Sequence, residues 1–134
     1  MYITLEADYA VRIMVCLAKA ACSGGKTNAK SVSEQTNVNL RFALKILSKL
    51  VLAGLVQSFK GTNGGYKLAK TAQEISLYDV ISVVDGDCYM SRCVKNPDEC
   101  ARCSTCKTQK IYKEISGLIF DRLSQTKIDT LIDE

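Results

Sequence analysis

Histidine and tryptophan are absent from the sequence, and proline occurs only once, at Pro97. Without histidine there can be no Ser-His-Asp triad, no Cys-His nucleophile pair, no His-ligated haem and no mixed Cys/His zinc finger. No apolar run approaches the ~20 residues that a membrane-spanning helix needs, and the first residues do not resemble a signal peptide. We therefore expect a cytoplasmic protein without a membrane partner.

The residues that are present are typical of a folded domain. The chain has 134 residues, of which 47% are hydrophobic and 24% charged, and this length permits a buried core. No acid–base pair stands out. The glycines Gly61, Gly64 and Gly65 do not form a nucleotide-binding fingerprint, because they lie in a predicted hairpin and not ahead of a helix. We therefore do not expect an enzyme.

The net charge of +4 is unevenly distributed along the chain. Residues 1–70 contain ten Lys or Arg and three Asp or Glu, whereas residues 71–134 contain eight and eleven. A basic half followed by an acidic half suggests a head that binds a polyanion and a separate body. A solvated basic face without a partner is the alternative interpretation.

The first half has the pattern of a winged helix-turn-helix domain. Apolar spacing predicts helices over residues 4–21 and 40–53, the second capped by Asn39, and a capping box at Ser31 predicts a short helix to Thr36 between them. Alternation over 55–59 and 66–68, around a glycine-rich turn, predicts a β-hairpin. In this order a short helix supports a longer helix that can enter the major groove of DNA, and the hairpin forms the wing.

The second half predicts two further helices separated by an irregular segment. A capping box at Ser76 begins a helix over 77–84, and an amphipathic helix follows over 105–123. Thr126 is expected to cap a short terminal helix. The apolar stripe of the long helix must pack against another surface, either the first helix or a second subunit.

Five of the seven cysteines lie in the irregular segment, residues 88–106, which we call the cysteine loop. An odd number of cysteines in a chain that does not look secreted argues against a disulfide framework. Thiolates are soft ligands, so an iron–sulfur cluster is one interpretation and a structural zinc at Cys100-x2-Cys103 is another. Free thiols acting as a redox switch are the third.

Three motifs together resemble the Rrf2 family of bacterial transcriptional regulators, over residues 1–133. They are Thr4-x3-Asp8-Tyr9-Ala10-x-Arg12, the hairpin block from Ala53 to Ala69, and the segment from Ile75 to Gly86. The resemblance implies a homodimer that binds a double-stranded DNA operator. It implies a mainly α fold with a small β-hairpin wing: residues 1–75 would form the winged helix-turn-helix domain, and residues 76–134 would carry the cluster loop and a long dimerisation helix.

The resemblance also implies an iron–sulfur cluster, of 2Fe-2S or 4Fe-4S type, on Cys93, Cys100 and Cys106. IscR-type members use a histidine as fourth ligand, three residues after the last cysteine, where this chain has Gln109. NsrR-type members use an aspartate from the first helix of the partner subunit, and Asp8 stands at that place. Cys103 and Cys88 are additional thiols, and either could be a ligand instead. Asp8 and Cys103 are the favoured candidates for the fourth ligand.

The resemblance places the recognition helix in residues 40–53 and the wing in 60–66. The expected DNA-binding residues are Ser31, Ser33, Asn39, Arg41, Phe42, Lys45, Lys49, Lys60, Gly61, Asn63, Gly64 and Tyr66. Arg41 can read guanine in the major groove. Lys60 replaces an arginine that usually begins the wing, and lysine cannot make the same bidentate contact.

We therefore expect a transcriptional regulator, such as a repressor, whose operator binding changes when a cluster is lost to oxygen, nitric oxide or iron shortage. One alternative is a regulator of the same family without a cluster, which uses its cysteines as thiol switches or holds a structural zinc. The other is an iron–sulfur electron-transfer protein, although the basic head and the hairpin argue against it.

Overall fold

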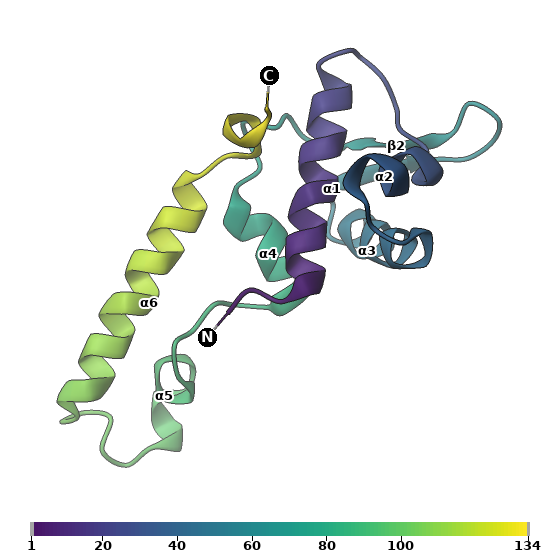
Figure 1. Cartoon of the computed structure of the whole chain (residues 1–134). Coiled ribbons are helices and arrows are strands. Elements are labelled where there is room, and N and C mark those ends of the chain that lie inside the picture. Colours follow the sequence, from purple (N-terminus) through teal and green to yellow (C-terminus); the bar gives the residue numbers. More distant parts are fainter. Residues whose placement is uncertain (1, 134) are drawn as a thin grey trace.

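The computed structural model describes residues 2–133 and is mainly helical, with one two-stranded hairpin (Figure 1). Its elements in chain order are α1 (Leu5–Ala21), α2 (Ala29–Thr36), α3 (Leu40–Leu52), β1 (Val56–Phe59), β2 (Gly65–Leu68), α4 (Leu77–Asp85), α5 (Arg92–Lys95), η1 (Pro97–Glu99), α6 (Lys107–Gln125) and η2 (Ile128–Leu131). The predicted fold class, mainly α with a β-hairpin, is confirmed. None of the helices in this part of the chain is long and apolar enough to span a membrane.

Side-chain caps determine where the first three helices begin. Thr4 accepts a hydrogen bond from the N–H of Ala7, at 3.2 Å, and Asn39 accepts one from the N–H of Arg41, at 2.9 Å. The predicted capping box at Ser31 is wrong. Asn28 caps α2 by accepting from the N–H of Ser31 at 2.8 Å, so the helix begins earlier and Ser31 lies within its first turn.

The wing is an antiparallel pair in which Val56 lies opposite Leu68 and Phe59 opposite Gly65. Its turn depends on glycine. A Cβ added to Gly64 would lie 2.3 Å from the carbonyl oxygen of Phe59, and Gly61 has a φ of +96°. Both positions therefore exclude ordinary side chains without a change in the backbone. The hairpin is joined to the start of α2 by backbone hydrogen bonds between Thr27 and Tyr66.

One hydrophobic core joins the two halves of the chain. Its largest fully buried side chains in the first half include Ile13 and Leu17 of α1 and Leu47 of α3. Val80 of α4 and Ile128 of η2 belong to the same cluster, so the beginning and the end of the second half both pack on the first half. Each such side chain contributes roughly 1.5–3 kcal/mol through burial.

The second half matches the prediction at α4 and differs near the C-terminus. Ser76 and Asp79 form the predicted capping box, with hydrogen bonds in both directions. Thr126 does not cap the terminal helix, because its hydroxyl donates to the carbonyl of Arg122 in the last turn of α6, at 2.8 Å. The terminal element is a 3₁₀ helix that begins at Ile128, without a side-chain cap.

The long helix α6 is poorly covered. It extends away from α1 (Figure 1), and Ser116 is its one buried residue. Tyr78 of α4 packs edge-on against Phe120, with ring centroids 4.7 Å apart. On other parts of the helix Ile111 is 51% exposed and Leu118 is 68% exposed. The rest of residues 2–133 therefore leaves these apolar side chains of α6 uncovered.

Candidate nucleic-acid interface and cysteine loop

Helix α3 presents a basic face to solvent because its opposite face is buried. Ala43, Ile46, Leu47 and Leu50 point into the core, and this leaves Arg41, Phe42 and Lys45 on the outside. Arg41 forms no ion pair with residues 2–133. Phe42 is half-exposed and packs edge-on against Tyr9, with ring centroids 6.4 Å apart. The face therefore combines a free guanidinium with an apolar ring.

Glu6 of α1 neutralises part of this basic face. Its Oε1 accepts a hydrogen bond from Lys49 Nζ at 2.7 Å and lies 3.9 Å from Lys45 Nζ. Lys49 is the less exposed of the two lysines. The sequence does not reveal this role of Glu6, because 43 residues separate Glu6 from Lys49.

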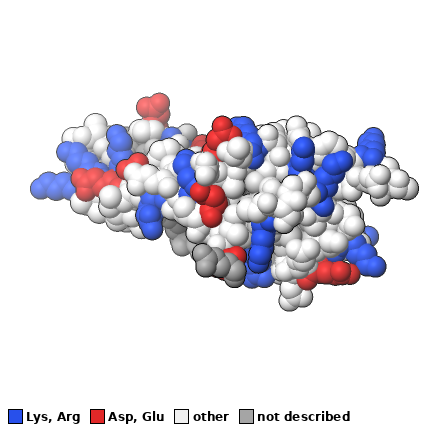
Figure 2. Space-filling view, turned by 90° about the horizontal axis from the view of Figure 1, so that it is seen from above, with Lys and Arg blue, Asp and Glu red and all other residues white. Residues whose placement is uncertain are grey.

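The wing is basic and adjoins α2. Lys60, Gly61 and Asn63 are exposed at its tip, and Gly64 and Tyr66 are partly covered. Lys26 was not predicted as part of it, although Lys26 Nζ lies 4.3 Å from the centre of the Phe59 ring and 3.5 Å from the carbonyl oxygen of Asn63. In Figure 2 the basic side chains of the winged half have few acidic neighbours. Toward α6, on the left of the view, acidic and basic side chains lie next to one another.

The two predicted phosphate contacts in α2 differ in availability. The hydroxyl of Ser33 donates to the carbonyl of Val38 at 2.6 Å, so it is engaged inside the protein. Ser31 is partly exposed in the first turn of α2, and its backbone N–H is held by the Asn28 cap. Ser31 is the more accessible candidate. Asn39 is exposed, but its side-chain oxygen already caps α3.

The cysteine loop brings some of its thiols together. Cys93 lies on α5, with its Sγ 3.0 Å from the hydroxyl of Ser91. The Cys103 Sγ is 3.9 Å from the carbonyl oxygen of Cys93, to which it donates. Partial desolvation raises the pKa of the Cys103 thiol, and the neighbouring thiols of Cys100 and Cys93 raise it further. Cys103 therefore lies near both Cys93 and Cys100.

Cys106 lies in a different environment, at the N-cap of α6. The backbone N–H of Gln109 lowers the pKa of the Cys106 thiol, and the N–H of Thr108 and the charge of Arg102 act in the same direction. A helix N-terminus favours thiolate because its N–H groups are unpaired and carry partial positive charge. Gln109 also donates its side-chain amide to the carbonyl of Cys93, at 3.5 Å.

The chemistry of these donors fits an iron–sulfur cluster or a zinc ion, because both are bound by thiolates. Within the described residues, however, no three Cys, Asp or Glu side chains are grouped closely enough to hold a metal ion. Asp8 is on α1, where it pairs with Arg12 at 2.9 Å and is half-exposed. The loop would have to close for the predicted ligands to converge.

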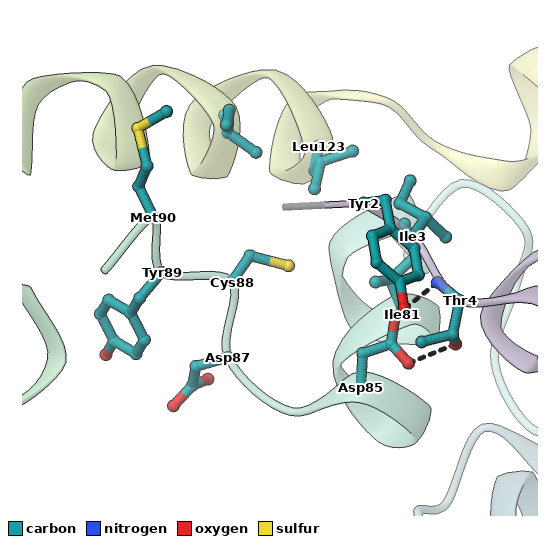
Figure 3. Close-up of a pocket in the computed structure, with 11 residues that line it drawn as sticks. Tyr2, Ile3, Thr4, Ile81, Asp85, Asp87, Cys88, Tyr89, Met90 and Leu123 are labelled. Carbon is teal, nitrogen blue, oxygen red and sulfur yellow. Dashed lines mark hydrogen bonds between the residues drawn. The ribbon is translucent and has the colours of Figure 1, made fainter. Parts of the chain in front are cut away.

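A cavity of about 690 Å³ separates the N-terminal segment from α6 (Figure 3). Its lining is largely apolar and includes Tyr2, Ile81, Met90 and Leu123; Cys88 also lines it, apart from the other loop thiols. At its edge Asp85 accepts hydrogen bonds from the hydroxyl of Thr4, at 2.5 Å, and from its N–H, at 3.2 Å. The end of α4 is thereby attached to the start of α1.

Comparisons with known proteins agree with this arrangement. The family model described as "Rrf2: Iron-dependent Transcriptional regulator" matches residues 3–134. The HTH-type transcriptional regulator IscR of Pectobacterium atrosepticum is 32% identical over 133 residues, which cover 99% of this chain and 80% of the relative.

Two solved structures have the same fold. CymR, described as the global cysteine regulator of B. subtilis, has a TM-score of 0.78 at 26% identity, over 98% of this chain and 95% of the other. The oxidized form of Staphylococcus aureus CymR has a TM-score of 0.76 at 27% identity, over 100% and 98%. The predicted winged helix-turn-helix fold is therefore confirmed.

Proposed function

Because the chain belongs to the Rrf2 family of helix-turn-helix transcriptional regulators, and is not an enzyme, we propose that an iron–sulfur cluster in the cysteine loop controls its binding to an operator. In this proposal residues 1–75 bind DNA. Residues 76–134 hold the cluster and form a homodimer. The observation that carries the proposal is a chain of contacts between the cysteine loop and α3. Asp85, which precedes the loop, accepts hydrogen bonds from Thr4 at the start of α1. Glu6, in the first turn of α1, pairs with Lys49 of α3.

DNA binding would use the exposed face of α3 and the wing. Arg41, Phe42 and Lys45 are placed to reach base edges in the major groove. Lys60 and the backbone around Gly61 and Gly64 would contact phosphates, which position the protein without reading sequence. The exposed lysines of this half support such contacts.

A second copy of the chain is the partner that we propose for α6. Its exposed apolar side chains, including Ile111, Tyr112 and Leu118, would be covered by the equivalent helix of the other subunit. A two-fold symmetric dimer presents two α3 helices, and these would bind half-sites about one turn of DNA apart. The distance between the two helices then determines operator affinity.

The first turn of α1 offers a route from the cysteine loop to α3. Thr4 is bonded to Asp85, which ends α4 just before the loop, and Glu6 is bonded to Lys49. Thr4 is also the N-cap of α1, so Thr4 and Glu6 belong to one rigid turn. A movement of the loop that displaces Asp85 would therefore shift or release the lysines of α3.

Cys93, Cys100 and Cys106 would hold the cluster, together with a fourth ligand. A bound cluster would supply a centre that oxygen, nitric oxide or iron shortage can destroy. Loss of the cluster would change the conformation of the loop, and this change would reach both α4, which precedes the loop, and α6, which follows it. A coupling of roughly 1–3 kcal/mol would change operator affinity about 5- to 150-fold.

The test compares loaded and cluster-free protein on the same DNA. Protein purified without oxygen is analysed for visible absorption, iron and sulfide, and a binding duplex is selected from a randomised library with the loaded form. We expect the loaded and cluster-free forms to differ in affinity for that duplex by at least about fivefold. Equal affinities at matched salt would contradict control by the cluster while leaving DNA binding intact.

A cluster-free thiol switch is the second candidate. The structural likeness to CymR, including a structure of its oxidized form, favours it. In that case purified protein is colourless, anaerobic reconstitution fails, and peroxide changes DNA affinity reversibly with a thiol reductant. A colourless protein with one zinc per chain would instead indicate a structural zinc site in the cysteine loop. DNA binding that falls steeply with salt would exclude a role limited to electron transfer.

A further inference from the structure

We infer that Cys103, and not Asp8 of a partner subunit, supplies the fourth ligand, so that the metal site is complete within one chain. This inference rests on the proposed function, and it specifies which residues hold the cluster. It predicts a set of four thiolates, Cys93, Cys100, Cys103 and Cys106. All four lie within residues 93–106, and no residue of another subunit takes part.

The position of Cys103 supports this assignment. Its Sγ donates to the carbonyl oxygen of Cys93, at 3.9 Å, although ten residues separate the two cysteines. The backbone also turns tightly here, because the N–H of Cys103 donates to the carbonyl of Cys100 at 3.3 Å. Two cysteines separated by two residues on such a turn direct their thiols to the same side, as in zinc knuckles.

The contacts of Asp8 satisfy its carboxylate without a metal ion. Its carboxylate pairs with Arg12 at 2.9 Å, one turn further along α1, and both side chains are about half-exposed. Acidic residues in the first turn of a helix are also stabilised by the helix dipole. To bind a cluster Asp8 would have to leave Arg12 and reach the loop of another subunit, whereas Cys103 already lies beside two of the other ligands.

The surroundings of the loop favour a set of four thiolates. Cys103 would add a fourth negative charge to the other three ligands. Lys95, Arg102 and Lys107 lie within or beside the loop and can offset that charge. Gln109 occupies the position of the histidine of IscR-type members, but its amide donates to the carbonyl of Cys93 at 3.5 Å and supports α5 instead. Its position gives Gln109 a structural role next to the ligands.

The experiment compares three single variants of the full chain, Cys103→Ala, Asp8→Ala and Cys88→Ala. Cys88 is the matched control, because it is a loop cysteine that lines the cavity away from the other thiols. Each protein is reconstituted without oxygen. Iron and sulfide per chain, the visible spectrum and the rate of iron loss to a chelator are measured, with circular dichroism to confirm folding.

We expect Cys103→Ala to lose iron to the chelator at least tenfold faster than wild type, since even partners of metal ligands contribute about 10- to 100-fold to affinity. Its spectrum should change in shape, whereas Asp8→Ala and Cys88→Ala should match wild type. A wild-type spectrum and retention rate in Cys103→Ala would overturn the inference, as would a loss confined to Asp8→Ala. A wild-type protein that cannot be loaded would overturn the proposed cluster and this inference together.

Dilution provides a measurement that does not depend on a variant. A ligand from the same chain makes iron retention independent of protein concentration, even where the dimer dissociates. A ligand from the partner subunit links retention to dimerisation. We expect the rate of iron loss to stay constant across the dissociation range, determined by sedimentation velocity on the same samples. A rate that rises as dimers dissociate would contradict a site within one chain.

Discussion

The winged region and the α5–α6 region are built in opposite ways. Helices α1 and α3 share a core of fully buried side chains, whereas Ser116 is the one buried residue of α6, and α5 and η1 contain none. The winged region is therefore stabilised by contacts within the chain. Helices α5, η1 and α6 begin without a side-chain cap and bury little, so few contacts within the described residues stabilise the α5–α6 region. The stability of such a region changes most when a ligand or partner binds to it.

The largest effect separates the two regions by stability. Leu47 of α3 is fully buried, and Leu118 of α6 is 68% exposed. We expect Leu47→Ala to lower the free energy of unfolding by about 2–5 kcal/mol, because it leaves a cavity in the core. The matched change Leu118→Ala should leave the unfolding of the winged region within about 0.5 kcal/mol of wild type.

Denaturant unfolding followed by circular dichroism measures both effects, and sedimentation velocity measures the dimer. Leu118→Ala should weaken dimerisation although it leaves the core unchanged. At concentrations where the protein is monomeric, Leu118→Ala could lose as much stability as Leu47→Ala. That result would show that α6 is stabilised by contacts within its own chain, contrary to this comparison.

The second effect tests the connection between the regions. Asp85→Ala removes both hydrogen bonds from Thr4 to the end of α4. We expect the affinity ratio between loaded and cluster-free protein to move toward one, while the affinity of the cluster-free form for DNA stays within about twofold of wild type. Fluorescence anisotropy with a selected duplex measures the ratio. An unchanged ratio would mean that the first turn of α1 does not carry the signal.

The third effect concerns the charge of α3. Glu6→Gln leaves Lys49 and Lys45 without their carboxylate partner. We expect DNA affinity to rise about two- to fivefold at low salt, since partly exposed ion pairs of this kind contribute up to about 1 kcal/mol. The gain should shrink as salt is raised, because the lysine–phosphate contacts are screened. Glu34→Gln on α2 is the matched control, and an equal gain there would indicate a general effect of net charge.

The smallest effect lies at the contact of α4 with the start of the cysteine loop. The hydroxyl of Tyr78 donates to Asp87 at 2.7 Å, and this hydrogen bond, followed by partial burial and the charge of Asp87, raises the pKa of Tyr78 from 10.0 to about 12. A pKa raised by folding means that the unfolded chain loses this proton first. The stabilisation is therefore complete below pH 10 and is lost as the pH rises from 10 to about 12.

Tyr78→Phe removes this titration while it keeps the ring against Phe120. We expect wild type to lose more stability than Tyr78→Phe between pH 9 and about 12, measured as the shift in the denaturant midpoint. Identical shifts in the two proteins would show that the hydrogen bond to Asp87 does not persist in solution.

Several features were predictable from the sequence because they depend on neighbours within a few residues. Helical periodicity identified α1, α3, α4 and α6 within one or two residues, and alternation around glycines identified the wing. The caps at Asn39 and Ser76 were also found. The errors at Ser31 and Thr126 have a common reason: several polar side chains near a helix end can each make the local hydrogen bond, and packing selects one.

The donor chemistry and the family were also determined by the sequence alone. The motifs around Asp8, Gly61 and Ser76 indicate an Rrf2 regulator, and five cysteines in residues 88–106 indicate a site for a soft metal or a redox signal. These properties follow from residue types and their spacing, which folding does not change.

Only the tertiary structure decided which distant residues meet. The bond from Thr4 to Asp85 spans 81 residues, the pair of Glu6 and Lys49 spans 43, and no local pattern encodes either. The shared core that includes Val80 and Ile128, and the position of Cys103 beside Cys93, arise in the same way. The physical reason is that periodicity and caps act over one or two turns of chain. Contacts between remote segments depend instead on how the buried faces of the helices pack together.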